Sequence, residues 1–301
     1  MSIRSLILLV STSALFALGF TSARANWHHH SVSINDGQRR PAIDCSDLRI
    51  RFDDRDAVVR SEERTVTKPE APVLEIQPHA NGGVQVAGWD KDTYSVTACK
   101  AAAGAGDEAE RTLSQITWSI EKGRISTKGP ADEGEWTVYL LIRAPKSAAI
   151  DVETTNGPVS FYDVDGKLTA HAHNGPITLR NFSGDAEIRA ENGPISLEGT
   201  SGNVRVHTEN GPISVALKGK TWSGTGLSAD AKNGPLTLRV PPDYESSFVV
   251  ESTKYAPMSC KASLCDQAHR TWDDEHRRIE YGAAPALIHL STVNGPVSVS
   301  N

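Results

Sequence analysis

Beyond residue 25, the sequence lacks any run that approaches the roughly 20 apolar residues needed to cross a bilayer as a helix. The one long apolar run, Leu6 to Phe20, follows Arg4 and precedes Ala23-Arg24-Ala25, which is typical of a secretory signal peptide and its cleavage site. No cysteine stands at that point to carry a lipid. We therefore expect residues 1–25 to be removed, and an exported product, periplasmic or secreted to the cell surface, with no transmembrane segment.

The sequence also lacks an excess of positive charge. Without Arg4 and Arg24, the 31 basic residues fall to 29 against 37 acidic ones, so the mature chain carries a formal charge of −8 with neutral histidines. This balance argues against a nucleic-acid or anionic-membrane partner, because both attract basic surfaces.

Motifs of common enzyme classes are missing as well. The sequence contains no Gly-x-Ser-x-Gly, no His-Glu-x-x-His, no phosphate-binding loop and no dinucleotide fingerprint. We therefore predict no catalytic residue, no metal site and no cofactor.

Cysteines are few, and their number is even. The four are Cys45, Cys99, Cys260 and Cys265, and three pairings are possible on paper. We favour Cys260 with Cys265, because the short intervening loop can close locally, which leaves Cys45 with Cys99. Free thiols are the alternative, although an exported chain favours disulfides.

What the sequence has instead is a repeat. The tripeptide Asn-Gly-Pro begins at four positions with a spacing of 18 residues and returns twice later in the chain. Turn chemistry accounts for its composition, because Gly and Asn tolerate unusual backbone angles and Pro suits a position without a ladder donor. We interpret these residues as a structural turn ladder in which stacked asparagines exchange amide hydrogen bonds; a row of ligand-binding asparagines is the alternative. The ladder consists of Asn156, Gly157, Pro158, Asn174, Gly175, Pro176, Asn192, Gly193, Pro194, Asn210, Gly211, Pro212, Asn233, Gly234, Pro235, Asn294, Gly295 and Pro296.

Each tripeptide is followed by alternating apolar and polar residues, such as Ile177-Thr178-Leu179, which indicates a strand with one buried face. A second turn recurs at Gly166, Gly184 and Gly202, and a second alternating strand follows each one. Two strands and two turns in about 18 residues predict an all-β fold, a parallel β-helix whose successive coils stack about 4.8 Å apart.

The remaining segments complete the predicted organisation. After the signal peptide, residues 26–44 are expected to form a mobile arm, residues 45–145 an N-terminal β region continuous with the solenoid, and residues 146–301 the β-helix. Within the N-terminal region we expect strands at 73–77, 84–87, 94–98, 116–120 and 136–142, a hairpin turn at Asn81-Gly82 and a short helix at 107–115. An excursion at 241–290 interrupts the period, with strands at 248–252, 278–281 and 286–290 and a disulfide-closed loop that caps the stack.

The sequence resembles a known family in these features. The signal peptide, the Asn-Gly-Pro strands, the alternating second strands and Gly88-Trp89-Asp90 are similar to the bacterial putative-adhesin family of β-helical domains of unknown function. The resemblance extends roughly from Cys45 to Asn301. It implies surface adhesion and brings no catalytic motif.

Three groups of polar side chains are candidates for chemistry. Outward residues before each tripeptide form a column, and beside it run His171, Arg189 and His207; the column consists of Thr155, His173, Glu191, Glu209 and Lys232. This column could bring His173, Glu191 and Glu209 near one metal ion, but parallel side chains on a flat sheet seldom converge to bonds of about 2.0 to 2.2 Å, so we interpret it as a solvated face.

The other two groups are simpler. The run His28-His29-His30 could bind transition metals adventitiously, and a mobile arm is the simpler interpretation. The segment with His269, Asp273, Asp274 and His276 contains residue types that serve acid–base catalysis, and we interpret it as a charged loop.

Two functional hypotheses follow. The first is a non-enzymatic, adhesin-like scaffold that binds an envelope component, a glycan or a partner protein through a flat polar strip, formed by Ser160, Thr178, Ser196, Ser214 and Thr237. Self-association through coil ends is expected as well, because the final strand lies at the end of the sequence. The second is a polysaccharide-acting lyase or hydrolase, suggested by fold analogy alone. Exposed coil faces nearly free of aromatics, apart from Tyr162 and Trp222, weaken sugar stacking.

Overall fold

The computed structural model describes residues 32–35, 40–53, 55–79, 81–131, 135–253, 255–283 and 285–301. The predicted signal peptide 1–25 and the run His28-His29-His30 lie outside these residues. Strands dominate, and the prediction of a mostly β chain is confirmed. None of the helices in these ranges is long and apolar enough to cross a membrane.

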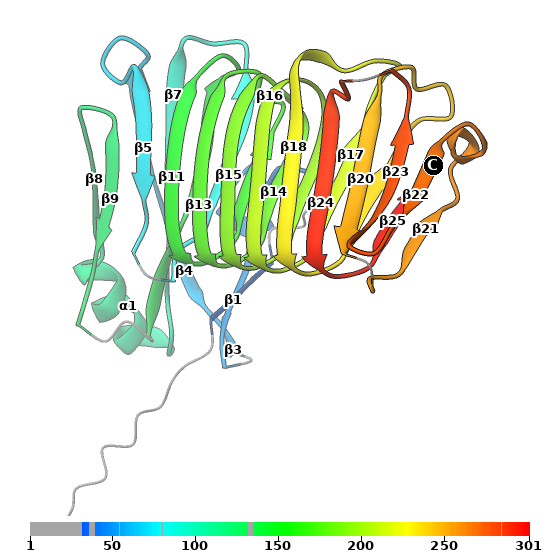
Figure 1. Ribbon diagram of the computed structural model, residues 1–301. Helices are drawn as coiled ribbons and strands as arrows, with labels where there is room; N and C mark the ends of the chain where they lie inside the picture. Colours follow the sequence, from blue (N-terminus) through cyan, green and yellow to red (C-terminus); the bar gives the residue numbers. More distant parts are fainter. Residues whose placement is uncertain are drawn as a thin grey trace, which may run out of the picture.

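Each repeat contributes one strand to each of two rows (Figure 1). Alternate residues of the strands in both rows are buried. The strands of the first row pair in parallel along the stack, with Asn156 beside Asn174 and Asn174 beside Asn192. The first row consists of β5 (Val73–Gln77), β11 (Ala149–Asn156), β13 (Lys167–Asn174), β15 (Asp185–Asn192), the second part of β16 (Ile195–Asn210), β18 (Ser223–Asn233) and β24 (Ile288–Asn294).

The second row is built from the strands that follow each Asn-Gly-Pro. They also pair in parallel, with Ile177 beside Ile195 and Ile195 beside Ile213. The second row consists of β6 (Val84–Trp89), β12 (Val159–Tyr162), β14 (Ile177–Ser183), the first part of β16, β17 (Ile213–Leu217), β19 (Leu236–Arg239) and β25 (Val297–Ser300). The 18-residue period therefore predicted the pairing partners correctly.

The core lies between the rows. Inward residues such as Leu168 and Ala170 of β13 and Ile177 and Leu179 of β14 are at most 1% exposed and belong to one continuous apolar cluster. A fully buried aliphatic side chain contributes about 1.5 to 3 kcal/mol. One repeat cannot offset the entropy of ordering its backbone, but neighbouring repeats that share this cluster can.

Asparagines form a hydrogen-bonded ladder along one corner of the stack. The Nδ2 of Asn174 donates to Oδ1 of Asn156 at 3.0 Å, and the same bond recurs from Asn192, Asn210, Asn233 and Asn294 to the preceding asparagine at 2.9 to 3.1 Å. Glycine is required beside each asparagine, because a Cβ on Gly193 would lie 2.1 Å from the carbonyl oxygen of Gly175.

The ladder begins one step earlier than the tripeptide indicates. Asn156 Nδ2 donates to Asn81 Oδ1 at 3.2 Å. The strands on either side of this turn pair with successive strands of the two rows, β5 with β11 and β6 with β12. The predicted hairpin at Asn81-Gly82 was therefore wrong, because this turn is a corner between the rows.

The N-terminal region closes the first end of the stack. Its antiparallel strands are β4 (Val58–Thr67), β7 (Thr93–Ala102) and β10 (Trp136–Pro145), and β10 also pairs in parallel with β6. The helix α1 (Gly106–Gln115) and the hairpin of β8 (Thr117–Glu121) and β9 (Arg124–Lys128) complete it, and β9 continues the first row beyond β5. The long strand β4 was not predicted, because its exposed residues lack a clear alternation.

A small antiparallel sheet packs beside this region. It consists of β1 (Val32–Asn35), β2 (Arg49–Phe52) and β3 (Arg55–Asp56). A short 3-10 helix, η1 (Cys45–Asp47), leads into β2 and carries Cys45, which is bonded to Cys99 of β7. The predicted mobile arm 26–44 thus contains a paired strand at 32–35, and Ala42 exchanges two hydrogen bonds with Gln85 of β6.

The excursion at 241–290 forms the other end. It contains β20 (Phe248–Thr253), β21 (Met258–Cys260), β22 (His269–Trp272) and β23 (His276–Tyr281). Between β21 and β22 lies η2 (Ser263–Asp266), and the Cys260–Cys265 disulfide joins the end of β21 to η2. The strand β24 lies between β18 and β20, and β25 lies between β19 and β21. The last Asn-Gly-Pro strands are therefore internal, so the basis on which self-association was predicted was wrong.

Candidate binding face

The outer side of the first row carries three columns of polar side chains. Because side chains alternate along a strand, residues two apart share the outer face, and parallel register stacks equivalent positions. The column just before the asparagines runs from Thr155 through His173, Glu191 and Glu209 to Lys232, as expected. The next column contains Glu153, His171, Arg189, His207 and Asp230. The third column contains Asp151, Thr169, Glu187, Arg205 and Ser228. We call this surface the histidine face.

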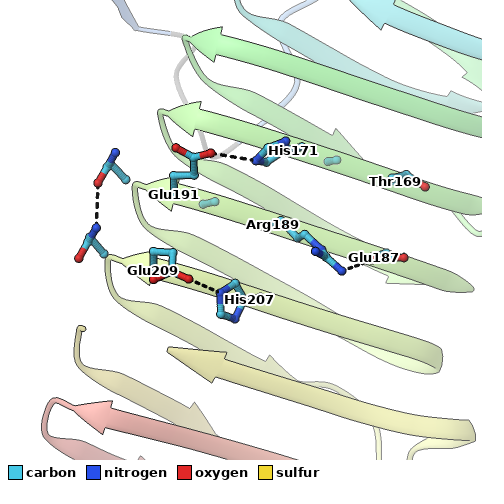
Figure 2. Close-up of a pocket in the computed structure, with 11 residues that line it drawn as sticks. Thr169, His171, Glu187, Arg189, Glu191, His207 and Glu209 are labelled. Carbon is cyan, nitrogen blue, oxygen red and sulfur yellow. Dashed lines mark hydrogen bonds and ion pairs between the residues drawn. The ribbon is translucent and has the colours of Figure 1, made fainter. Parts of the chain in front are cut away.

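A groove of about 570 Å³ crosses the histidine face between β13 and the second part of β16 (Figure 2). The ionisable residues that line it are His171, Glu187, Arg189, Glu191, His207 and Glu209. The guanidinium of Arg189 points to Glu187, with 2.7 Å between Nη2 and Oε1, and away from His171 and His207 (Figure 2).

The first cluster joins three neighbouring strands. His171 and His173 lie two residues apart on β13, and their ring centroids are 4.8 Å apart. Glu191 of β15 places Oε1 2.9 Å from His173 Nδ1 and 3.7 Å from His171 Nε2. On the other side, a ligand atom of Glu153 in β11 lies within 4.8 Å of one nitrogen of each histidine.

The second cluster centres on His207. Its Nδ1 lies 2.6 Å from Asp230 Oδ1, and its Nε2 lies 3.3 Å from Glu209 Oε1. Partial burial lowers the pKa of His207, but the hydrogen bonds to these two carboxylates outweigh it and raise the pKa above its ordinary value. The pKa of Glu209 is lowered, first by its contact with Lys232 Nζ at 3.0 Å and then by His207.

His173, Glu191 and Glu209 were considered as joint metal ligands and then interpreted as part of a solvated face. The structure brings Glu191 to His173, but it brings Glu209 to His207 and Lys232. Glu153 and Asp230 were not singled out in the sequence. The signal that could have found them is register, because each lies on the strand beside a histidine of the same column.

The predicted polar strip on the second row is shorter than expected. Ser160 and Thr178 are 2% and 8% exposed, whereas Ser196, Ser214 and Thr237 are accessible. Tyr162 and Trp222, expected on exposed faces, are buried at 3% and 4%. Exposed aromatic side chains occur instead near the cap, at Tyr255 and Trp272.

The charged segment near β22 and β23 stabilises its own turn. Asp273 Oδ1 accepts hydrogen bonds from the backbone N–H groups of Glu275 and His276 at 2.9 and 2.6 Å, and these bonds lower the pKa of Asp273. The Asp273 side chain is therefore engaged as a turn acceptor, and the imidazole Nδ1 of His276 lies 4.0 Å from Asp273 Oδ1. This arrangement does not provide a paired acid and base.

No protein-family model matches the sequence, and no curated protein matches it. Among solved structures, the chain is similar to a putative cell adhesion protein from Clostridium sporogenes, with a TM-score of 0.31 and 9% identity over 81% of this chain and 98% of that one. It is also similar to putative adhesins from Bacteroides fragilis (TM-score 0.35, 11% identity, 80% and 97% covered) and Parabacteroides distasonis (TM-score 0.36, 10% identity, 81% and 96% covered). At this level, the similarity carries no argument about what this chain binds.

Proposed function

We propose that this chain is an exported, adhesin-like scaffold without enzymatic activity, in which the two rows wind as a parallel β-helix and the histidine face binds an envelope glycan or a protein surface. The observation that supports this most directly is the regular array of polar side chains around the groove of about 570 Å³. Strand pairing fixes the spacing of the array at about 4.8 Å. A rigid array binds at low entropic cost, because its backbone is ordered before the partner arrives.

The charge pattern of the face defines the class of partner. Around the groove, Glu187, Glu191 and Glu209 alternate with Arg189 and two histidines. Carboxylates and guanidinium groups can accept from and donate to hydroxyls or match a mixed-charge protein surface. Such a face favours a polar, hydroxyl-rich or mixed-charge partner over an apolar one.

Export is part of the same proposal. The pattern Arg4, Leu6 to Phe20 and Ala23-Arg24-Ala25 supports a cleaved signal peptide. The two disulfides, Cys45–Cys99 and Cys260–Cys265, support an oxidising compartment, because such bonds persist outside the cytosol.

The polysaccharide-acting alternative has less support in this groove. Glycoside hydrolysis by two carboxyl groups needs one with a raised pKa to act as general acid. In the groove, the pKa of Glu209 is lowered. Glu191 is engaged by two imidazoles, with its Oε1 2.9 Å from His173 Nδ1 and 3.7 Å from His171 Nε2.

The test is binding of the purified mature chain to a glycan array and to an isolated envelope fraction. The face variant Arg189→Glu/Arg205→Glu reverses two exposed charges on the histidine face. The control variant Arg239→Glu/Lys218→Glu makes the same change in net charge at or beside exposed ends of the second row. We expect the face variant to bind about tenfold or more weakly, since reversing two contacting charges costs more than about 1.4 kcal/mol, and the control to bind as the parent does.

Two results would refute the proposal. Equal loss of binding in both variants would mean that only net charge matters, and not the histidine face. Release of reducing ends or unsaturated sugars from any polysaccharide on the array would favour the enzyme instead.

A further inference from the structure

We propose that Glu153, His171, His173 and Glu191 form a binding site for a divalent transition-metal ion of the zinc class. This inference is independent of the proposed function, because it concerns one cluster and not the partner of the whole face. The ligand types fit, since imidazole nitrogen and carboxylate oxygen are the usual N and O ligands of Zn²⁺. The sequence predicted no metal here, because a single column of parallel side chains does not converge.

Convergence comes from combining two columns on three strands. The His-x-His pair on β13 puts both imidazoles on the outer face. Register then places Glu153 directly beside His171 on one side, and Glu191 beside His173 on the other. The carboxylates therefore flank the histidine pair, and all four side chains can face one point above β13.

The distances are close to those of a metal site. Four ligands at about 2.0 to 2.2 Å in a tetrahedron lie about 3.3 to 3.6 Å from one another. Glu191 Oε1 already lies 2.9 Å from His173 Nδ1 and 3.7 Å from His171 Nε2, while ligand atoms of Glu153, His171 and His173 lie within 4.8 Å of each other. The histidine and Glu191 side chains are 37% to 47% exposed, so small rotations can close the set around an ion.

This cluster differs from the other histidines of the face in the basic side chains near its carboxylates. Glu209 beside His207 already contacts Lys232 Nζ at 3.0 Å, and Glu251 beside His289 contacts Arg278 Nη1 at 3.1 Å. Glu191 instead contacts the imidazoles of His171 and His173, and Glu153 Oε2 accepts a hydrogen bond from Gln77 Nε2 at 2.7 Å. Two carboxylates and two imidazoles supply four ligand groups of the kind that a divalent cation takes, and the Gln77 contact orients one carboxylate as outer hydrogen bonds do in metal sites.

The experiment is a calorimetric titration of the mature chain with ZnCl₂, with no affinity tag. All proteins carry His28→Ala, His29→Ala and His30→Ala, so that this run contributes no binding. We expect one ion per chain in this parent, and binding at least about tenfold weaker in His173→Ala and in the isosteric variant Glu191→Gln. The matched control His289→Ala removes an imidazole from the same face and should bind as the parent does.

A second readout is the visible spectrum of Co²⁺ added in place of Zn²⁺. A tetrahedral site gives strong ligand-field absorption, which we expect in the parent and in His289→Ala and not in His173→Ala. Unchanged far-ultraviolet circular dichroism shows that each variant is folded. The proposal is overturned if the parent binds no Zn²⁺, if His173→Ala and Glu191→Gln both bind as tightly as the parent, or if His289→Ala weakens binding equally.

Discussion

Replacing Asn192 by alanine measures what the asparagine ladder contributes to stability. Asn192 Nδ2 donates to Asn174 Oδ1 at 3.1 Å, and its own Oδ1 accepts from Asn210 Nδ2 at 3.0 Å. The substitution removes both bonds and leaves an acceptor on one neighbour and a donor on the other without their ladder partner. Asn192 is exposed, so water replaces part of what is lost.

The expected magnitude follows from the number of bonds. A typical intramolecular hydrogen bond contributes a net of about 0.5 to 1.5 kcal/mol, and exposure favours the lower part of this range. We therefore expect Asn192→Ala to lower the free energy of unfolding by about 1 to 2 kcal/mol. The matched variant is Asn294→Ala, since Asn294 is also exposed and its side chain makes a single ladder bond, to Asn233 at 2.9 Å. Its loss should be about half as large.

The assay is equilibrium unfolding in urea, followed by circular dichroism and by tryptophan fluorescence. Coincident transitions are required, because a stack of repeats can unfold in parts and then a single free energy is not defined. The reasoning is refuted if Asn294→Ala costs as much as Asn192→Ala, or if neither changes the midpoint. In that case the ladder would reflect turn geometry and not a stabilising interaction.

Two further predictions use the same protein. The Cys45–Cys99 bond spans 54 positions and Cys260–Cys265 spans 5, so loop entropy predicts that double serine variants lose about 4 and about 2 kcal/mol respectively; urea unfolding that gives the reverse order would contradict this. His207 has a raised pKa in the folded protein, so its contribution to stability is fully present below about pH 6.5 and is lost as pH rises through the folded-state pKa. The stability difference between the parent and His207→Gln should therefore shrink with rising pH, NMR titration should show that Asp230→Asn lowers the pKa of His207, and a difference that grows with pH would refute the assignment.

The pairing of the regular repeats was predictable from the sequence because period and register are the same quantity in a parallel stack. Once Asn174 and Asn192 are neighbours, the strands before and after these corners pair with strands 18 positions on, apart from a local register shift at Phe182, which pairs with Gly199. The first step of the ladder was not predicted, because it does not follow the 18-residue period. Asn81 lies 75 positions before Asn156 and is followed by Gly-Gly, without the proline that marks the later corners.

The candidate site was less predictable, because it depends on where flexible side chains meet. The sequence placed His173 and Glu191 in one column, but the cluster also draws on Glu153 and His171 from the next column. Periodicity assigns each residue to a face and leaves side-chain rotamers open. Periodicity also does not show which faces other segments cover, so Ser160 and Thr178 were expected on an open strip although they are buried.

The position of β24 and β25 makes completion of the fold depend on chain order. The strands β20 to β23 are synthesised first, yet they attach to the stack through β24 and β25, which are synthesised after them. Until those two strands insert, β18 and β19 on one side and β20 and β21 on the other present unpaired edges of the kind that recruits foreign strands. A prematurely terminated chain would thus expose two adhesive edges at once, which gives cellular quality control a clear feature to recognise.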